Sequence, residues 1–131
     1  MDATHTAEAT AADAGTHKYR DLTQGVSARL AGLRSSTPEV MKAFGDLGRA
    51  ATAPGALDRK TKELIALAVS VAARCEPCIG FHAQALVKLG ATRQEIDELL
   101  GVTTYMGGGP SLMYAASALA AFDEFAAGRA A

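Results

Sequence analysis

Residues 57–92 read LDRKTKELIALAVSVAARCEPCIGFHAQALVKLGAT, and this stretch decides the fold. It predicts two helices with a short break between them. Asp58 is a cap for the first helix, which is apolar on nearly all sides after its first turn, so we expect it to be the central, buried helix. Pro77 cannot continue the hydrogen-bond ladder of that helix, but it fits the first turn of a new one. Gly90 is a natural end for the second helix.

Further helices are predicted on both sides of this stretch. Helical periodicity begins at Tyr19, and Thr37-Pro38 pairs an N-cap hydroxyl with a proline at the first helical position. The segment Thr92-Arg-Gln-Glu95 matches a capping box, and Gly107-Gly-Gly-Pro110 breaks the chain before a last helix over about residues 111–127. No segment shows the period-two alternation of a strand. The pattern predicts an all-α fold of about six helices.

Composition agrees with a small helical domain. The chain of 131 residues has room for one core, and it is 49% hydrophobic but only 5% aromatic, with much of the apolar content in alanine. Residues 1–17 contain almost no large apolar side chains, so they are predicted to form a flexible tail. Residues 18–131 are predicted to form a single domain. Its alanine-rich helix faces suggest a homo-oligomer.

Charge and targeting signals narrow the functional classes. Lys and Arg number 13 against 14 Asp and Glu, for a net charge of -1, which argues against a nucleic-acid binder. No apolar run approaches the roughly 20 residues that span a bilayer, and the N-terminus does not resemble a secretory signal. We therefore expect a cytoplasmic protein with no membrane partner. In that reducing compartment, two cysteines three residues apart are more often catalytic or metal-binding than structural.

The residues that carry chemistry are Cys75, Cys78, His82 and Glu63. Cys78 falls in the first turn of the predicted second helix, where free N–H groups and the helix dipole favour a thiolate and lower the pKa of the thiol. His82 lies one turn further along the same face. In a regular helix the Cβ atoms of Cys75 and Cys78 would be about 5–6 Å apart, beyond the roughly 3.5–4.5 Å of a disulfide. A break near Pro77 would close that gap.

Glu63 lies on the preceding helix, and two antiparallel helices joined at a tight corner would bring it toward His82. The predicted proton relay is Glu63, His82 and Cys78, the arrangement of nucleophile, base and orienting group found in covalent catalysts. The Cys78 thiolate would attack a peroxide and become a sulfenic acid. Cys75 would then condense with it to a disulfide, which an external dithiol, a protein or a small molecule, must reduce.

The spacing Glu63-x(11)-Cys75-x-x-Cys78-x(3)-His82 resembles the active-site signature of the AhpD-like (alkylhydroperoxidase D) and carboxymuconolactone decarboxylase superfamily, short single-domain branch. The sequence YMGGGPSLMYAA near the C-terminus is also similar, and the resemblance covers roughly residues 37–125. It implies an all-α fold, assembly as trimers or hexamers, and no metal or organic cofactor. It also implies that Cys78 attacks the peroxide and that Cys75 is the resolving partner, with Glu63 and His82 in the relay. In one departure, Pro77 replaces a second histidine found in peroxidases of this group.

Other interpretations remain open from the sequence. The cysteines could be small buried apolar residues, or zinc ligands together with His82, although a fourth ligand would have to come from His5 or His17 in the tail. A thioredoxin-like fold lacks its strand–helix–strand pattern here. The chain could instead be a lactone decarboxylase in which Glu63 and His82 perform acid–base chemistry, or a non-catalytic oligomeric assembly module.

Overall fold

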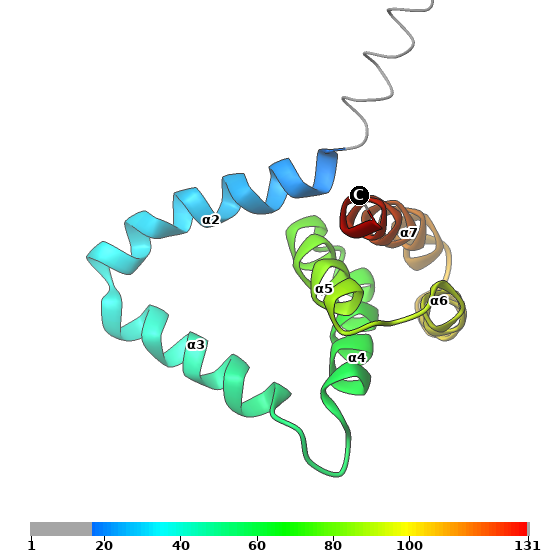
Figure 1. Cartoon of the computed structure of the whole chain (residues 1–131), viewed down its shortest axis with the longest axis horizontal. Coiled ribbons are helices and arrows are strands. Elements are labelled where there is room, and N and C mark those ends of the chain that lie inside the picture. Colours follow the sequence, from blue (N-terminus) through cyan, green and yellow to red (C-terminus); the bar gives the residue numbers. More distant parts are fainter. Residues whose placement is uncertain (1–16, 131) are drawn as a thin grey trace, which may run out of the picture.

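The computed structural model describes residues 17–130, which form six α-helices in an all-α fold, as the sequence predicts (Figure 1). The helices are α2 (Lys18–Ser36), α3 (Pro38–Thr52), α4 (Arg59–Ala72), α5 (Glu76–Lys88), α6 (Arg93–Gly107) and α7 (Gly109–Ala130). The predicted flexible tail lies outside the described residues except for His17, which is the N-cap residue of α2.

The core lies among α4, α5, α6 and α7, and α5 and α7 share the most extensive helix–helix contact. The buried apolar residues of these four helices are Leu67, Val71, Ile79, Ala83, Leu86, Ile96, Leu100, Ala115, Ala118, Ala121 and Phe122. The expectation that the helix after Asp58 is the central, buried one is wrong. This helix, α4, packs through one face only and leaves Ile65 48% and Val69 60% exposed.

Most helix ends follow the local signals. The Asp58 carboxylate accepts a hydrogen bond of 2.7 Å from the backbone N–H of Thr61, and Thr92 and Glu95 form the predicted capping box. Gly108, at φ 73°, separates α6 from α7 inside the predicted glycine break. Thr37 is the N-cap residue of α3 and Pro38 its first residue, as predicted, but capping by the Thr37 hydroxyl is wrong, because this hydroxyl donates instead to the Leu33 carbonyl of α2, 2.9 Å away. With α2 ending at Ser36, that carbonyl lies within reach of Thr37 and also accepts its backbone N–H, at 2.7 Å.

α2 and α3 extend away from the other four helices (Figure 1). The first turn of α2 is held by Glu124 of α7, whose carboxylate accepts the backbone N–H groups of Tyr19 and Arg20 at 3.0 and 2.8 Å. α2 also approaches α5 closely at Gly80, where a Cβ atom would lie only 2.7 Å from the Thr23 methyl group. The start of α2 is therefore part of the packed body.

α3 has a different character, because none of its residues is buried. Val40, Phe44 and Leu47 follow helical spacing and are 65%, 71% and 63% exposed. Such an apolar face on a protein surface is typical of an interaction site. No helix in residues 17–130 combines the length and apolar character needed to cross a membrane.

Candidate active site

The corner between α4 and α5 positions the cysteine pair. α4 ends in a Schellman turn, in which the N–H groups of Arg74 and Cys75 donate to the carbonyls of Val71 and Ser70, both at 3.1 Å. Arg74 occupies the left-handed position of this turn at φ 58°, where glycine is usual, and it is the only non-glycine residue with positive φ between residues 17 and 130. The chain is thereby redirected so that α5 starts immediately after Cys75.

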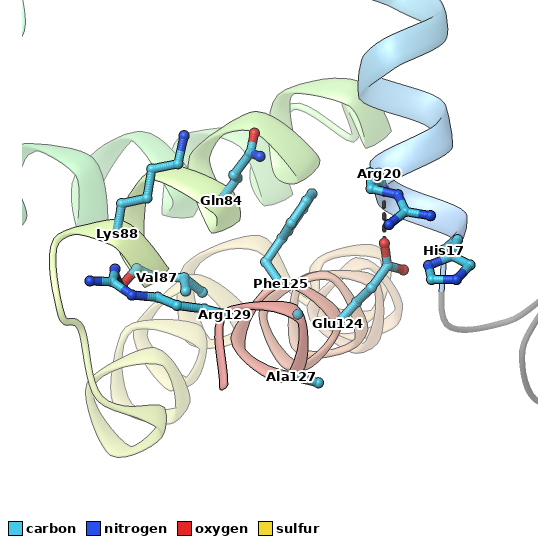
Figure 2. Close-up of a pocket in the computed structure, with 10 residues that line it drawn as sticks. His17, Arg20, Gln84, Val87, Lys88, Glu124, Phe125, Ala127 and Arg129 are labelled. Atoms are coloured by element: carbon cyan, nitrogen blue, oxygen red, sulfur yellow. Dashed lines mark hydrogen bonds between the residues drawn. The ribbon is translucent and has the colours of Figure 1, made fainter. Parts of the chain in front are cut away.

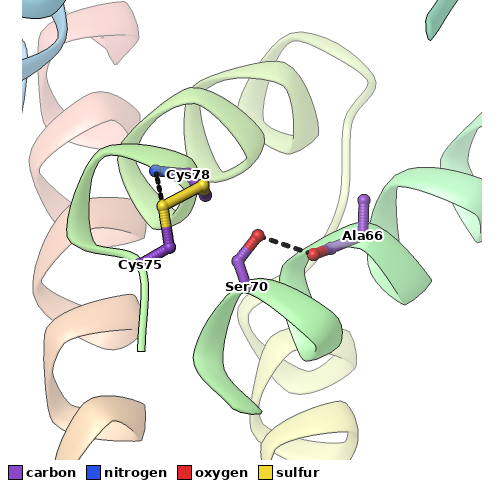
Figure 3. Close-up of a disulfide and its surroundings, with 4 residues drawn as sticks. All are labelled: Ala66, Ser70, Cys75 and Cys78. Atoms are coloured by element: carbon purple, nitrogen blue, oxygen red, sulfur yellow. Dashed lines mark hydrogen bonds between the residues drawn. A yellow bond between two sulfur atoms is a disulfide. The ribbon is translucent and has the colours of Figure 1, made fainter. Parts of the chain in front are cut away.

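Cys75 and Cys78 form a disulfide at the start of α5 (Figure 3). Cys75 is the N-cap residue with extended backbone angles, φ -106° and ψ 96°, and its sulfur accepts the N–H of Cys78 at 3.3 Å. The extended N-cap brings the two Cα atoms to 5.2 Å, within the usual range for a disulfide. The gap anticipated for a regular helix is closed at Cys75 itself, two residues before Pro77, near which the break was predicted.

Glu63 and His82 meet across α4 and α5. The distance from His82 Nδ1 to Glu63 Oε2 is 2.6 Å; the Glu63 side chain is 7% exposed and the His82 side chain 33%. With a proton on Nδ1, the imidazole donates to the carboxylate, which fixes the ring and leaves Nε2 available to accept a proton. Within residues 17–130 no hydrogen bond joins His82 to Cys78, so the complete relay stays a prediction.

Glu76, between the two cysteines, was not identified by sequence reasoning. Its Oε1 accepts a hydrogen bond of 3.0 Å from the Ser117 hydroxyl of α7, while its Oε2 is buried with no hydrogen-bond partner. Tyr19 of α2 lies beside this carboxylate and is 2% exposed. Burial raises the pKa of the Tyr19 phenol, and the Glu76 carboxylate raises it further, against an opposing effect of Ser117. The only sequence signal was a glutamate in the first turn of a helix, a common stabilising feature.

The cysteines and His82 were also considered above as zinc ligands. Both sulfurs are bonded to each other, and the described part of the chain contains no group of three or more His, Cys, Asp or Glu side chains placed to hold a metal ion. The zinc ligand His5 considered above lies outside that part of the chain.

A cavity of about 690 Å³ lies between the start of α2, the end of α5 and the end of α7 (Figure 2). Its lining residues are His17, Arg20, Gln84, Val87, Lys88, Glu124, Phe125, Ala127, Gly128 and Arg129. Arg129 spans one edge by donating to the Val87 carbonyl at 2.7 Å. None of the residues at the α4–α5 corner lines this cavity, so it is distinct from the candidate active site.

Comparison with known proteins identifies a family. Residues 38–121 match the model of the carboxymuconolactone decarboxylase family. An uncharacterized protein of Cupriavidus necator is 40% identical over 98 residues, which cover 75% of this chain and 87% of the relative. Another, described as uncharacterized protein 4 in the cox locus of Paracoccus denitrificans, is 40% identical over 82 residues, covering 63% and 74% of the two chains.

Two solved structures are also similar. A carboxymuconolactone decarboxylase family protein from Legionella pneumophila is 57% identical with a TM-score of 0.83, and the match covers 84% of this chain and 98% of that one. A second family member, from Thermotoga maritima, is described as having a possible part in an antioxidative response. It is 30% identical with a TM-score of 0.74, and the match covers 82% of this chain and 92% of that one.

Proposed function

The chain belongs to the carboxymuconolactone decarboxylase family, and on that premise we propose that it is a cysteine-based peroxidase and thiol–disulfide oxidoreductase acting in antioxidant defence. The observation that carries the proposal is the Cys75–Cys78 disulfide at the N-terminus of α5. A helix start stabilises a thiolate, the form of cysteine that attacks peroxides. The buried Glu63 carboxylate against His82 supplies a base one turn away.

The proposed reaction begins with the Cys78 thiolate. Its sulfur attacks one peroxide oxygen, the O–O bond breaks, and Cys78 becomes a sulfenic acid. The departing alkoxide takes a proton delivered through His82 and leaves as an alcohol. The Cys75 thiol then attacks the Cys78 sulfur, the hydroxyl leaves as water, and the disulfide forms. An external dithiol reduces it to two thiols and is itself oxidised to a disulfide.

Peroxide consumption with dithiothreitol as the reductant tests this proposal, combined with mass spectrometry of the protein. We expect turnover and an intramolecular disulfide in the wild type. The variant Cys75→Ser should accumulate a sulfenic acid at Cys78, because the resolving thiol is absent. If both thiols remain unmodified at excess peroxide, the peroxidase proposal is wrong.

A second candidate is acid–base chemistry on a lactone, as the family name suggests. The Glu63–His82 pair supports it, because a buried carboxylate that orients an imidazole needs no cysteine to transfer protons. Product analysis with a carboxylactone distinguishes the two activities. Cys78→Ser should abolish peroxide reduction while leaving a decarboxylase activity intact.

We also propose that the chain forms a homo-oligomer, trimer or hexamer, through the exposed face of α3. Val40, Phe44 and Leu47 form an apolar stripe without a partner in the described part of the monomer. Light scattering of the wild type and of Phe44→Glu tests this, because a buried charge would dissociate the assembly. Loss of assembly without loss of thiol chemistry would separate an oligomeric enzyme from a purely structural module. The cytoplasmic location stays a prediction.

A further inference from the structure

We propose that Glu76 sets the redox balance of the Cys75–Cys78 pair, because its buried negative charge opposes formation of the neighbouring thiolate and favours the disulfide. This inference rests on the proposed thiol–disulfide function and adds a control residue to it. Glu76 would act on the cysteines through its charge and would not touch the peroxide, so it is a positioning residue and not a catalytic one.

Glu76 lies at the same helix start as the cysteine pair. It is the first residue of α5, one position after Cys75 and two before Cys78. Its side chain turns toward α7, where Oε1 accepts the Ser117 hydroxyl proton. Glu76 therefore shares the start of α5 with both cysteines, so its charge acts on any thiolate formed there.

The charge of Glu76 is also poorly compensated. Oε2 is buried without a hydrogen-bond partner, and among residues 17–130 no Lys, Arg or His forms an ion pair with Glu76. The two side chains beside it, Ser117 and Tyr19, are hydroxyls, and burial keeps the Tyr19 phenol protonated by raising its pKa. Hydroxyls stabilise a carboxylate less than a cation does.

The surrounding charged groups do not cancel this effect. From α7, Glu124 adds a second negative charge near Tyr19, and it is already bound to the backbone of α2. From α4, Glu63 is paired with His82. The α5 helix dipole remains as the favourable partner, and it must stabilise both Glu76 and the Cys78 thiolate. Two like charges that share one helix start disfavour each other.

Reduction of the disulfide creates a thiolate beside Glu76, whereas the disulfide itself is neutral. Removing the Glu76 charge therefore stabilises the reduced form, lowers the pKa of the Cys78 thiol, and makes the pair a stronger oxidant. The expected size is about tenfold, which corresponds to about one pKa unit and to about 30 mV for this two-electron couple.

Two measurements on the full chain test this. The first is the pH dependence of iodoacetamide alkylation of Cys78 in a Cys75→Ser background. The second is the equilibrium of the Cys75–Cys78 disulfide with a glutathione redox buffer. With Glu76→Gln, we expect the alkylation midpoint to fall by about one pH unit and the equilibrium to shift about tenfold toward the dithiol. Glu39→Gln removes a matched charge from the first turn of α3 and should change neither quantity.

Glu76→Asp separates the charge from the hydrogen bond. Aspartate keeps the charge but is too short to preserve the Ser117 contact, so we expect values near the wild type. If Glu76 acts only as a tie between α5 and α7, Glu76→Asp should shift both values whereas Glu76→Gln, whose amide oxygen can still accept the Ser117 hydroxyl proton, should not, and the inference is overturned. Wild-type values in Glu76→Gln overturn it as well. If that variant does not fold, Glu76→Ala replaces it with the same expected shifts.

Neither measurement requires peroxide turnover. A protein that forms and exchanges the disulfide but does not reduce peroxide would contradict the proposed peroxidase activity, while the Glu76 inference would still be decided by the alkylation and glutathione data. A wild-type protein in which Cys78 reacts no faster than a free thiol would contradict the proposed peroxidase activity, and the comparison with Glu76→Gln would still decide the Glu76 inference.

Discussion

Two corners of the molecule share one backbone plan and use it differently. At the α4–α5 corner, a Schellman turn leads into an N-cap, Cys75, whose partner three residues later is Cys78. At the α5–α6 corner, another Schellman turn leads into an N-cap, Thr92, whose partner three residues later is Glu95. The second pair exchanges two hydrogen bonds as a capping box, whereas the first pair is joined by a disulfide.

The left-handed residue of each turn also differs. The α5–α6 corner uses Gly90 at φ 77°, which accepts this conformation without strain, whereas the α4–α5 corner uses Arg74 at φ 58°. Local strain of this kind is commonly retained near functional sites. The comparison teaches that a disulfide between cysteines three residues apart needs no special helix start: an ordinary N-cap already brings its own side chain and the one three residues later together.

The largest effect is expected from converting the first corner into the second. The double variant Cys75→Thr, Cys78→Glu places capping-box residues at the start of α5. It should retain its helix content, since the cap replaces the disulfide, and it should lose all peroxide reduction because no thiol remains. Circular dichroism and a peroxide-consumption assay test the two expectations. Residual turnover would place the chemistry elsewhere in the chain.

The next largest effect is expected at His82, which with Glu63 flanks only the first corner. His82→Ala should lower the rate of peroxide reduction by about 10²–10⁴-fold, because a positioned base is lost. Gln84→Ala, on the same helix, is the matched control and should keep the wild-type rate. Stopped-flow measurement of disulfide formation after peroxide addition makes the comparison. Equal rates in the two variants would remove His82 from the relay.

A smaller effect is expected at the left-handed residues. Gly90→Ala should reduce the free energy of unfolding by about 1 kcal/mol, because the added Cβ disfavours positive φ. Arg74→Gly should change it by less than about 1 kcal/mol, since relief of strain is offset by greater freedom of the unfolded chain. Urea unfolding measures both, with Gly48→Ala in exposed α3 as a control that stabilises. A larger loss from Arg74→Gly would mean that its side chain stabilises the corner.

The smallest expected effect is on stability in acid, and it involves the α5–α6 corner. The Thr92 backbone N–H and the Lys60 ammonium lower the pKa of Glu95 below its ordinary value of 4.5. A lowered folded-state pKa stabilises the protein above that ordinary value, and the contribution is lost as the pH falls through the folded-state pKa. Urea midpoints measured from pH 6 downward should therefore fall less steeply in Glu95→Gln. Glu98→Gln, an exposed glutamate on α6, should follow the wild type.

Much of the fold could be predicted because its signals are local. Asp58, Gly90 and the Thr92–Glu95 box act on backbone groups within a few residues, so the sequence alone identifies the helix ends. The proximity of Glu63 and His82 was also predicted, because it requires only two neighbouring helices and a tight corner.

The failures depend on distant parts of the chain or on competing partners. Glu76 was missed because its burial and its bond to Ser117 require α7, 41 residues later. The Thr37 hydroxyl was assigned to the wrong partner because a carbonyl in the last turn of α2 competes for it. The position of α4 was misjudged because an apolar surface does not say whether another helix covers it; Ile65 and Val69 remain exposed. The catalytic roles of the site residues stay predictions.

The N-cap position of Cys75 has a dynamic consequence. In the disulfide form, the Cys75 sulfur accepts a hydrogen bond from the Cys78 N–H and also links the N-cap covalently to the first turn of α5. In the reduced form this covalent link is absent, so the first turn can open locally at a lower free-energy cost than the rest of the helix. Amide hydrogen exchange at Cys78 and Ile79 should then be faster in the reduced protein. The redox state of the cysteine pair would thus set how often the start of α5 opens, and a partner protein could recognise that difference.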